Sequence, residues 1–334
     1  MESKLKVAVI GAGNIGKTHL RCYADHAESQ PVAVCDMAQD KAQALADQYG
    51  LRAYGTVEEL LRNEELDAVS VATAGFENGS HHFEPTMRVL EAGIPVLCEK
   101  PISNNIEEAR QMAAKARDKG VRFGINLNHR FTPAAERLKK LQTDSDLGEV
   151  LFINMALWFN GGDPPPYQHI RALYPHSIDV MRFFGGDIKR VQCFMTRAAD
   201  RKQSWSTLSL NLQFESGAIG HLTGSQDMSW GHPIERCEVA GSKGRAIIHN
   251  VYQRLEWMPR DSREKMVLDN GIFGGMNEFD DTFIRRIDTF IKELQNGSDI
   301  TASGEDGLAA QEVIEAAIRS HENGTVEEVA LRAP

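Results

Sequence analysis

The sequence of 334 residues lacks three features that would each assign it to a class of protein. It has no run of about 18 apolar residues, so we expect no segment to span a membrane. It has no block of basic residues, and its formal net charge of −10 argues against nucleic acid or an anionic membrane surface as the main partner. Its five cysteines are scattered, without Cys-x-x-Cys pairing, which favours reduced structural thiols in the cytoplasm.

Internal repeats are also missing, and the one low-complexity tract is the triplet Pro164-Pro165-Pro166. The given sequence enters a predicted strand and a glycine loop at once, so we expect no signal peptide. A content of 42% hydrophobic and 25% charged residues is that of an ordinary folded protein. The length predicts two domains, each large enough to bury its own core.

The first feature that the chain does have is a nucleotide-binding pattern. A strand at residues 5–10 precedes Gly11-Ala12-Gly13-Asn14-Ile15-Gly16, and a helical stretch follows. Gly11 would permit the tight turn, Gly13 the approach of a pyrophosphate, and Gly16 the close packing of helix on strand. The helix that begins around Asn14 and Ile15 would direct its positive end at the phosphates. A glycine turn in some other α/β protein is the alternative interpretation.

A second strand at residues 32–35 ends at Asp36, which is 20 residues after Gly16 (36 − 16). A carboxylate at that distance would accept the hydroxyl groups of the adenosine ribose. The same carboxylate would repel a 2′-phosphate, and the next two residues bring no arginine to offset that repulsion. The sequence therefore predicts NAD as the cofactor in preference to NADP, and it predicts no metal site.

Strands and helices alternate up to about residue 127, which is typical of a parallel sheet with right-handed crossovers. The strand around residues 95–98 delivers Glu99 and Lys100 together and stops at Pro101. Lys100 would thus lie at the carboxyl end of a parallel strand, where ligands bind in open α/β sheets. A solvated Glu-Lys pair is the alternative. Thr73 ends a further strand.

Two histidines follow Thr73 in a glycine-containing loop, His81 and His82. They could line the cofactor cleft, but a loop position with no partner identifiable from sequence favours solvent-exposed side chains.

After Gly148 the pattern changes to strands with alternating apolar and polar residues, and few helices intervene. The predicted strands span residues 149–159, 190–196, 205–214, 218–225, 234–240 and 245–249. Such a pattern indicates a mostly antiparallel, open-faced sheet, of which one face packs on helices and the other can pair subunits. Two amphipathic helices with apolar stripes follow near residues 283–294 and 310–318.

A long polar connection at residues 160–171 is typical of a binding loop or lid. It precedes Pro175, which suits the first turn of a helix, and His176 and Asp179 would share a face of that helix. A histidine there could exchange a proton near neutral pH. An imidazole that is merely held by Asp179 is the alternative.

Together these segments resemble the Gfo/Idh/MocA oxidoreductases, a family that includes glucose–fructose oxidoreductase and inositol dehydrogenase. The resemblance covers nearly the whole chain. The matching segments are residues 11–16, Cys98-Glu99-Lys100-Pro101, Asn128-His129-Arg130-Phe131-Thr132-Pro133, His176-Ser177-Ile178-Asp179, residues 304–308 and residues 320–324. It implies an α/β protein with an N-terminal Rossmann domain, a doubly wound parallel sheet, and a C-terminal α/β domain with a large, mostly antiparallel open-faced sheet. We place these domains at residues 1–126 and 127–334, the second binding the substrate and forming a homodimer or homotetramer.

By this resemblance Lys100 would stabilise negative charge on the reacting oxygen, Glu99 would contact the nicotinamide ribose, and His176 would be the general base. Further residues predicted to bind the cofactor are Thr73 and Arg130. Those predicted to contact substrate, besides Lys100 and His176, are Asn160, Tyr167, Arg171 and Asp179. One departure is Ala172, where many members have an aspartate, which weakens a specific prediction of inositol as substrate. Arg171 beside it could favour an acidic sugar or equally face solvent.

The resulting hypothesis is an NAD-dependent dehydrogenase that acts on a hydroxyl group of a sugar, sugar acid or cyclitol. Two alternatives remain open. The first is an enzyme that cleaves glycosides or eliminates a group while it recycles NAD. The second is a non-catalytic NAD-binding regulator, against which the presence of both Lys100 and His176 argues.

Overall fold

The computed structural model describes residues 4–74, 81–228, 234–269 and 278–330. The chain divides into two compact units: unit 1 comprises Met1–Leu127 with Phe283–Leu308, and unit 2 comprises Asn128–Thr282 with Ala309–Pro334. The predicted domain division at residues 126 and 127 did not include the return of residues 283–308 to unit 1. That division stays a prediction, because contacts alone do not test which segments fold independently.

Unit 1 contains a six-stranded parallel sheet in the order β3-β2-β1-β4-β5-β6. This order is that of a dinucleotide-binding Rossmann fold and confirms the predicted fold class of the first half. Its strands are β1 (Leu5–Ile10), β2 (Ser29–Cys35), β3 (Arg52–Tyr54), β4 (Ala68–Val71), β5 (Val96–Cys98) and β6 (Phe123–Ile125). Its helices are α1 (Asn14–Asp25), α2 (Gln39–Tyr49), α3 (Val57–Asn63), α4 (Phe83–Glu91), α5 (Ile106–Lys119) and most of α8 (Glu278–Asn296).

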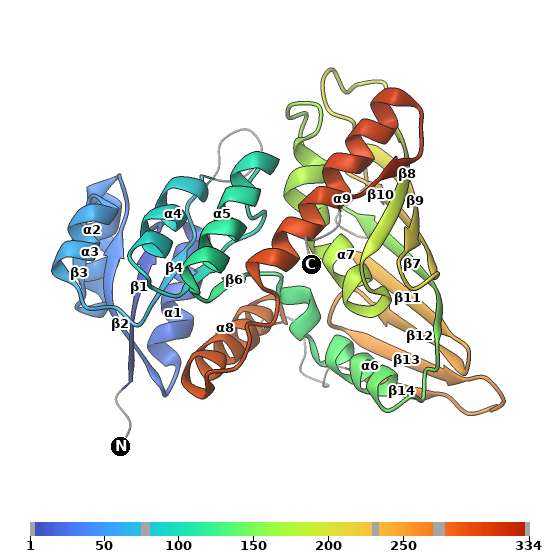
Figure 1. The fold of residues 1–334 in the computed structure, drawn as a ribbon, viewed down its shortest axis with the longest axis horizontal. Helices are drawn as coiled ribbons and strands as arrows, with labels where there is room; N and C mark the ends of the chain where they lie inside the picture. Colours follow the sequence, from blue (N-terminus) through green and yellow to red (C-terminus); the bar gives the residue numbers. More distant parts are fainter. Residues whose placement is uncertain (1–3, 75–80, 229–233, 270–277, 331–334) are drawn as a thin grey trace. The chain divides into compact units, whose positions relative to one another are not determined.

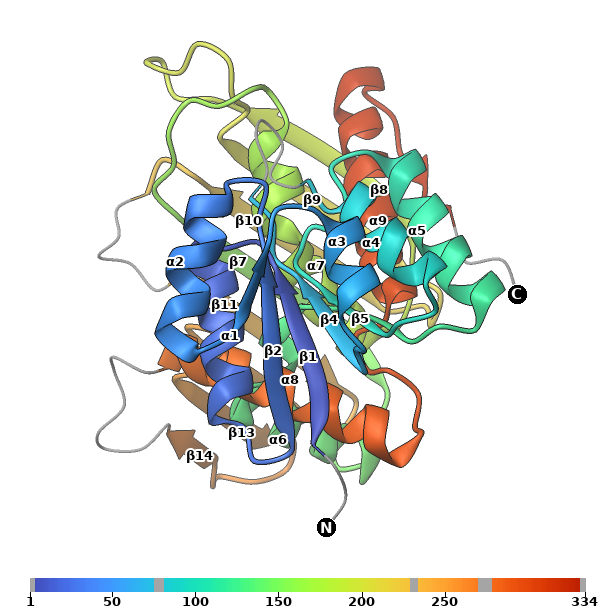
Figure 2. The same cartoon turned by 90° about the vertical axis from the view of Figure 1, so that its left-hand side faces the viewer.

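Helices cover both faces of this sheet. Figure 2 shows α1 and α2 on one side of the strands and α3, α4 and α5 on the other. The apolar stripe of α8 packs with α1 and α2 onto the first face, where Phe290 and Ile291 are fully buried. The apolar stripe of α8 is therefore part of the core of unit 1.

The segment Gly304–Leu308 begins helix α9 (Gly304–Asn323) and requires glycine at two positions. A Cβ atom on Gly304 would overlap the ring of Phe123, and one on Gly307 would lie 2.6 Å from Cγ1 of Ile125. Both neighbours belong to β6, so these glycines allow the start of α9 to approach the edge of the parallel sheet.

Unit 2 contains a nine-stranded mixed sheet in the order β14-β13-β12-β11-β7-β10-β9-β8-β15. Among its described strands only β7 and β10 pair in parallel, which confirms the predicted mostly antiparallel sheet. The strands are β7 (Val150–Trp158), β8 (Ile188–Thr196), β9 (Thr207–Phe214), β10 (Ile219–Ser225), β11 (Glu235–Gly241), β12 (Gly244–His249), β13 (Arg254–Pro259), β14 (Met266–Asp269) and β15 (Glu327–Glu328). The other elements are η1 (Asn128–Phe131), α6 (Pro133–Thr143), α7 (Gln168–Gly185) and the later part of α9.

One face of the large sheet packs on α6, α7 and α9, which lie together on it (Figure 1). Alternate residues such as Leu208, Leu210 and Leu212 of β9 point into this core and are almost fully buried. On the opposite face Phe194 and Ile219 are 59% and 62% exposed. The sheet is therefore open on one side within unit 2, as the alternating pattern predicts.

Helix α7 corrects the prediction for the segment around Pro175. The helix begins at Gln168, so Pro175 lies inside it, and residues 168–171 are helical rather than part of a loop. A proline in a helix interior costs about 3 kcal/mol, because it removes one hydrogen bond and crowds the carbonyl group four residues earlier. Burial of Ile170, Tyr174 and Ile178 on one face stabilises the helix on both sides of the proline.

All five cysteines are buried, and none of them forms a disulfide. No helix within the described ranges is both long and apolar enough to cross a bilayer.

Candidate active site

The loop between β1 and α1 has the backbone geometry that a dinucleotide site needs. Gly11 has a φ of +108°, and a Cβ atom on it would lie 2.5 Å from the carbonyl oxygen of Ala72. A Cβ atom on Gly16 would overlap the carbonyl oxygen of Gly11, so α1 can approach β1 this closely only with glycine there. A Cβ atom on Gly13 would meet no described atom within 4 Å, which leaves space where a pyrophosphate is expected.

Asn14 and Ile15 are the first residues of α1 and follow the N-cap residue Gly13, which has no side chain to cap the helix. The amide groups of a first helical turn and the helix dipole together favour an anion. The residues of this loop therefore fit the pyrophosphate of a dinucleotide.

Asp36 follows the end of β2, and each of its carboxylate oxygens accepts a hydrogen bond from a backbone amide, one of them in the glycine loop. Oδ2 accepts a hydrogen bond of 2.7 Å from the amide of Ala12, and Oδ1 accepts one of 2.9 Å from the amide of Ala38. The carboxylate is half-buried beside the glycine loop. It is thus fixed at the carboxyl ends of β1 and β2, the edge at which Rossmann folds bind the ribose of a dinucleotide.

Thr73 and His82 join two loops at the carboxyl edge of the same sheet. The hydroxyl of Thr73 donates to the carbonyl oxygen of His81, which is exposed. The ring nitrogens of His82 lie 2.8 Å from the carbonyl oxygen of Pro101 and 3.1 Å from that of Thr73. Burial lowers the pKa of His82, although these hydrogen bonds oppose the shift. The expectation of a solvated side chain was wrong for His82, because its two partners come from loops that only the fold brings together.

Glu99 and Lys100 follow the end of β5, as predicted. Oε1 of Glu99 accepts a hydrogen bond of 2.9 Å from Nε2 of His19 and a short one from the side-chain amide of Asn126. Its Oε2 accepts one of 3.2 Å from the backbone amide of Lys100. Burial by itself would raise the pKa of Glu99, but these donors and the charge of Lys100 outweigh it and lower the pKa below its usual range. Burial also lowers the pKa of Lys100, against the opposing effect of Glu99.

His176 lies in unit 2, in the middle of α7, and its ring stacks on that of His129 in η1. The ring centroids are 4.0 Å apart and the planes differ by 6°. Nδ1 of His129 lies 3.3 Å from Oε1 of the buried Glu235 at the start of β11. The other oxygen of Glu235 accepts a hydrogen bond of 2.5 Å from the hydroxyl of Ser177. A histidine pair and a carboxylate are thus joined within one unit.

Arg130 and Asp179, predicted to contact cofactor and substrate, bind each other in a buried, two-pronged ion pair. The guanidinium of Arg130 also lies over the ring of Phe183, 5.0 Å from its centroid. The pair joins η1 to α7 and so fixes the elements that carry His129 and His176. The predicted ligand contacts of both residues stay predictions, and so does the alternative in which Asp179 holds His176.

Three further residues predicted to contact substrate lie in the same unit. Arg171 forms a two-pronged ion pair with Glu315 of α9, with distances of 2.7 and 2.8 Å. The hydroxyl of Tyr167 donates to Oε1 of Glu322, also on α9. Asn160 is exposed and forms an isolated β-bridge with Asp227. Arg171 is therefore a half-buried residue with a carboxylate partner rather than a solvated one.

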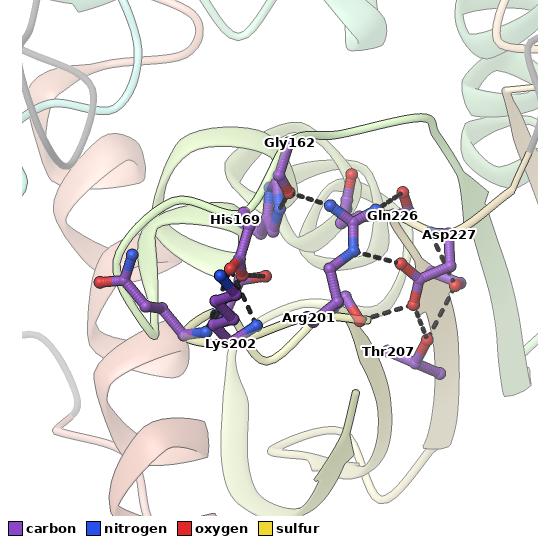
Figure 3. Close-up of polar contacts among 12 residues, drawn as sticks. Gly162, His169, Arg201, Lys202, Thr207, Gln226 and Asp227 are labelled. Atoms are coloured by element: carbon purple, nitrogen blue, oxygen red, sulfur yellow. Dashed lines mark hydrogen bonds and ion pairs between the residues drawn. The ribbon is translucent and has the colours of Figure 1, made fainter. Parts of the chain in front are cut away.

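The connection before α7 is attached to two neighbouring segments (Figure 3). The Arg201 guanidinium pairs with Asp227 at 2.8 Å and donates to the carbonyl oxygens of Gly162 and Gln226. Asp163 accepts hydrogen bonds from three consecutive backbone amides at residues 202–204. The amides of Ser204 and Lys202 hold the pKa of Asp163 well below its usual range. These contacts hold the connection at Gly162 and Asp163, and its predicted role as a binding loop or lid stays a prediction.

Sequence reasoning assigned no role to several polar residues that the fold places beside the predicted ones. They are His19, Ser70, Asn126, His129 and Glu235. A weak signal exists for His19, which lies on the otherwise apolar buried face of α1 with Leu20 and Tyr23. A polar side chain in such a position needs a partner, but the sequence does not name that partner.

Comparison with known proteins agrees with this geometry. The model of the Gfo/Idh/MocA oxidoreductase family, with its NAD-binding Rossmann fold, matches residues 5–127, and the model of the Gfo/Idh/MocA C-terminal domain matches residues 135–247. The inositol 2-dehydrogenase of Rhizobium meliloti (strain 1021) is 28% identical over 333 residues, covering 95% of this chain and 96% of that protein. The D-glucoside 3-dehydrogenase of Escherichia coli (strain K12) is 27% identical over 359 residues, covering 97% of both.

A solved structure of levoglucosan dehydrogenase with NADH and L-sorbose shares the fold. It superimposes with a TM-score of 0.88 at 20% sequence identity, covering 99% of this chain and 100% of that one. The two family models together match most of the chain, and the glycine loop has the geometry that the first model implies. This chain therefore belongs to the Gfo/Idh/MocA family of oxidoreductases and is a dehydrogenase that binds NAD through its Rossmann unit.

Proposed function

We propose that this protein oxidises a secondary hydroxyl group of a sugar, sugar acid or cyclitol with NAD⁺, or catalyses the reverse reduction. The observation that carries this proposal is the position of Glu99 and Lys100 directly after β5. They lie at the carboxyl edge of the parallel sheet that also carries the glycine loop and Asp36. The relatives named inositol 2-dehydrogenase and D-glucoside 3-dehydrogenase support a carbohydrate-like substrate.

In the proposed reaction His176 accepts the proton of the substrate hydroxyl group as the C–H bond of the same carbon breaks. The chemistry that the bound cofactor supplies is acceptance of the hydride. Lys100 donates a hydrogen bond to the reacting oxygen and stabilises the negative charge that develops there. Glu99 would accept a hydrogen bond from a hydroxyl of the nicotinamide ribose and so help to hold the bound cofactor.

Asp36 supports NAD rather than NADP in this proposal. Its carboxylate is held beside the glycine loop by two backbone amides, so it cannot easily swing away from a ribose 2′-substituent. A ribose 2′-hydroxyl can donate to such a carboxylate, whereas a 2′-phosphate would be repelled by it.

The test is a screen of inositols, aldoses, sugar acids and glycosides with NAD⁺ and NADP⁺, following formation of NADH or NADPH. We expect at least one substrate whose oxidation is lost in both Lys100→Ala and His176→Ala. The proposal would be overturned by the absence of any substrate, or by a substrate that both variants oxidise at the wild-type rate. Cleavage of a glycoside without net NADH would instead identify the cofactor-recycling reaction.

We also propose that the open face of the large sheet pairs subunits into a homodimer or homotetramer. The exposed Phe194 and Ile219 on that face support this proposal. Five buried cysteines without a disulfide fit a reducing compartment, and we propose the cytoplasm. Light scattering of Phe194→Glu/Ile219→Glu beside the wild type tests the assembly, because a monomeric wild type would rule it out.

A further inference from the structure

A chain of buried polar side chains leads from the interior of unit 1 to Glu99. His19 of α1 is fully buried, with Nε2 at 2.9 Å from Oε1 of Glu99 and Nδ1 at 3.0 Å from the hydroxyl of Ser70 on β4. The hydroxyl of Tyr23, also fully buried, lies 2.9 Å from that of Ser70. Asn126, just beyond β6, donates to the same oxygen of Glu99 as His19 does. These five residues come from α1, β4, and the ends of β5 and β6.

In one arrangement of the protons, every hydrogen-bond donor in this chain of side chains has an acceptor. An ionised carboxylate only accepts hydrogen bonds, so Nε2 of His19 must carry a proton toward Glu99. If Nδ1 is unprotonated, it accepts from Ser70, and Ser70 accepts from Tyr23, so every donor has an acceptor. If Nδ1 were protonated, Ser70 would accept from it, and the hydroxyl proton of either Ser70 or Tyr23 would lack an acceptor among the described residues. The hydrogen-bond pattern thus favours the tautomer with its proton on Nε2.

This arrangement gives the two carboxylate oxygens of Glu99 different hydrogen-bond partners. Oε1 accepts from both His19 and Asn126, whereas Oε2 accepts from the Lys100 backbone amide at 3.2 Å. A carboxylate oxygen offers about two acceptor sites, so Oε1 is occupied and Oε2 retains capacity for one more donor. The hydrogen bond from His19 therefore fixes the rotation of the carboxylate and decides which oxygen can receive a ligand.

We propose that His19, held by Ser70 and Tyr23, is a positioning residue for the cofactor. It keeps Glu99 ionised and turned so that Oε2 accepts a hydroxyl group of the nicotinamide-side ribose. This inference rests on the proposed function, because it takes Glu99 as the acceptor of that hydroxyl. It adds to that function a buried relay, a chain of hydrogen bonds that runs from α1 to Glu99. Of these residues, only Glu99 would contact the cofactor.

Two hydroxyl groups of unit 1 provide a matched pair of variants. Ser70 and Ser29 are both buried, and both contact Tyr23. Ser70 contacts the phenol hydroxyl of Tyr23. Ser29 instead donates to the backbone oxygen of Tyr23 at 2.7 Å and lies outside the relay. Ser70→Ala removes the group that holds Nδ1 of His19, whereas Ser29→Ala leaves the relay intact. His19→Leu removes the donor to Glu99, and His19→Gln can restore one through its side-chain amide.

The experiment titrates NAD⁺ into each variant and measures Kd, the melting temperature, and, at saturating NAD⁺, KM for the substrate. A hydrogen bond to a charged group contributes enough that we expect His19→Leu to weaken NAD⁺ binding about tenfold or more. We expect Ser70→Ala to weaken it about threefold, as for loss of a neutral hydrogen bond. His19→Gln should recover most of the affinity, Ser29→Ala should keep the wild-type Kd, and KM for the substrate should stay within about twofold of the wild type for a contact confined to the cofactor.

A folded His19→Leu with the wild-type Kd for NAD⁺ would overturn the inference. Equal Kd values in Ser70→Ala and Ser29→Ala would also overturn it, and this comparison decides the matter if His19→Leu does not fold. Binding of NAD⁺ needs no substrate, so this outcome is separate from the fate of the proposed reaction. If the proposed function is wrong, turnover in Lys100→Ala will be unchanged, whatever His19→Leu does to the Kd for NAD⁺.

Discussion

The imidazole rings of His129 and His176 lie face to face, with centroids 4.0 Å apart and planes within 6° of parallel. His129 is in turn held at 3.3 Å from the buried carboxylate of Glu235. The ring of the proposed general base is thus backed by a second ring whose own position is fixed. Such support matters because a base must lie within hydrogen-bond reach of the proton it removes.

This stack predicts different effects for two substitutions of His129. His129→Phe keeps a flat ring beside His176, whereas His129→Ala removes it and lets the His176 ring turn. Because misplacement of a catalytic group by about 1 Å can cost up to about a hundredfold in rate, we expect kcat to fall at least about tenfold in His129→Ala. We expect a smaller loss in His129→Phe. Steady-state kinetics on both variants, with melting temperatures as the control for folding, would check this, and equal rates in both would contradict it.

Asp36 predicts a change of cofactor preference. Asp36→Ala removes the carboxylate that accepts the amides of Ala12 and Ala38, and with it the acceptor for the ribose hydroxyl. Loss of a charged acceptor corresponds to about a tenfold to hundredfold weaker affinity for NAD⁺. The affinity for NADP⁺ should fall less or rise, because repulsion of the 2′-phosphate is removed. Titration of both dinucleotides would check the ratio, and a ratio that moves further toward NAD⁺ would count against this role.

The lowered pKa of Lys100 predicts the alkaline side of the pH profile. Burial favours the neutral amine, so the ammonium loses its proton at a lower pH than an ordinary lysine, for which the pKa is about 10.4. If the ammonium is the active form, kcat/KM falls as the pH rises through this lowered pKa. Glu99 opposes the shift. Glu99→Gln should therefore move the alkaline limb to still lower pH, in addition to weakening NAD⁺ binding.

Profiles of kcat/KM for the wild type and Glu99→Gln, measured at saturating NAD⁺, would check this sign. A limb that moves to higher pH in Glu99→Gln would show that Lys100 is not the group that titrates.

The hydrogen bonds that Asp163 accepts predict slow hydrogen exchange of the backbone amides at residues 202–204. Its pKa is lowered because the backbone amides of Ser204 and Lys202 donate to the carboxylate. A carboxyl group with a lowered pKa contributes stability above the usual aspartate pKa of about 3.9 and loses it only as the pH falls through the lower folded value. We expect Asp163→Ala to speed hydrogen exchange of the amides at residues 202–204 at neutral pH. Asp200→Ala, an exposed aspartate of the same loop, is the matched control and should leave their exchange unchanged.

Local patterns were enough to predict the elements that carry chemistry in unit 1. Gly11, Gly13 and Gly16 occur at a fixed spacing because a turn, a ligand approach and a helix contact each exclude a side chain at that point. Lys100 could be placed at a strand end because Pro101 interrupts the ladder. These signals act within a few residues of one another, so they can be read along the chain.

The partners of the site residues could not be predicted in this way. Glu99 meets His19 across 80 residues of sequence, Arg130 meets Asp179 across 49, and Arg171 meets Glu315 across 144. In each case the side chain alone is compatible with several partners, and the order of strands and the faces of the helices decide among them.

The amino-acid sequence by itself therefore determined the family, the parallel sheet, the cofactor loop and the position of Lys100 at a strand end. The tertiary structure decided that α7 continues through Pro175, that residues 283–308 join the first unit, and that His176 stacks on His129. The physical reason is range. Backbone geometry and hydrophobic periodicity act between near neighbours, whereas burial and ion pairing select partners only after distant segments have packed together.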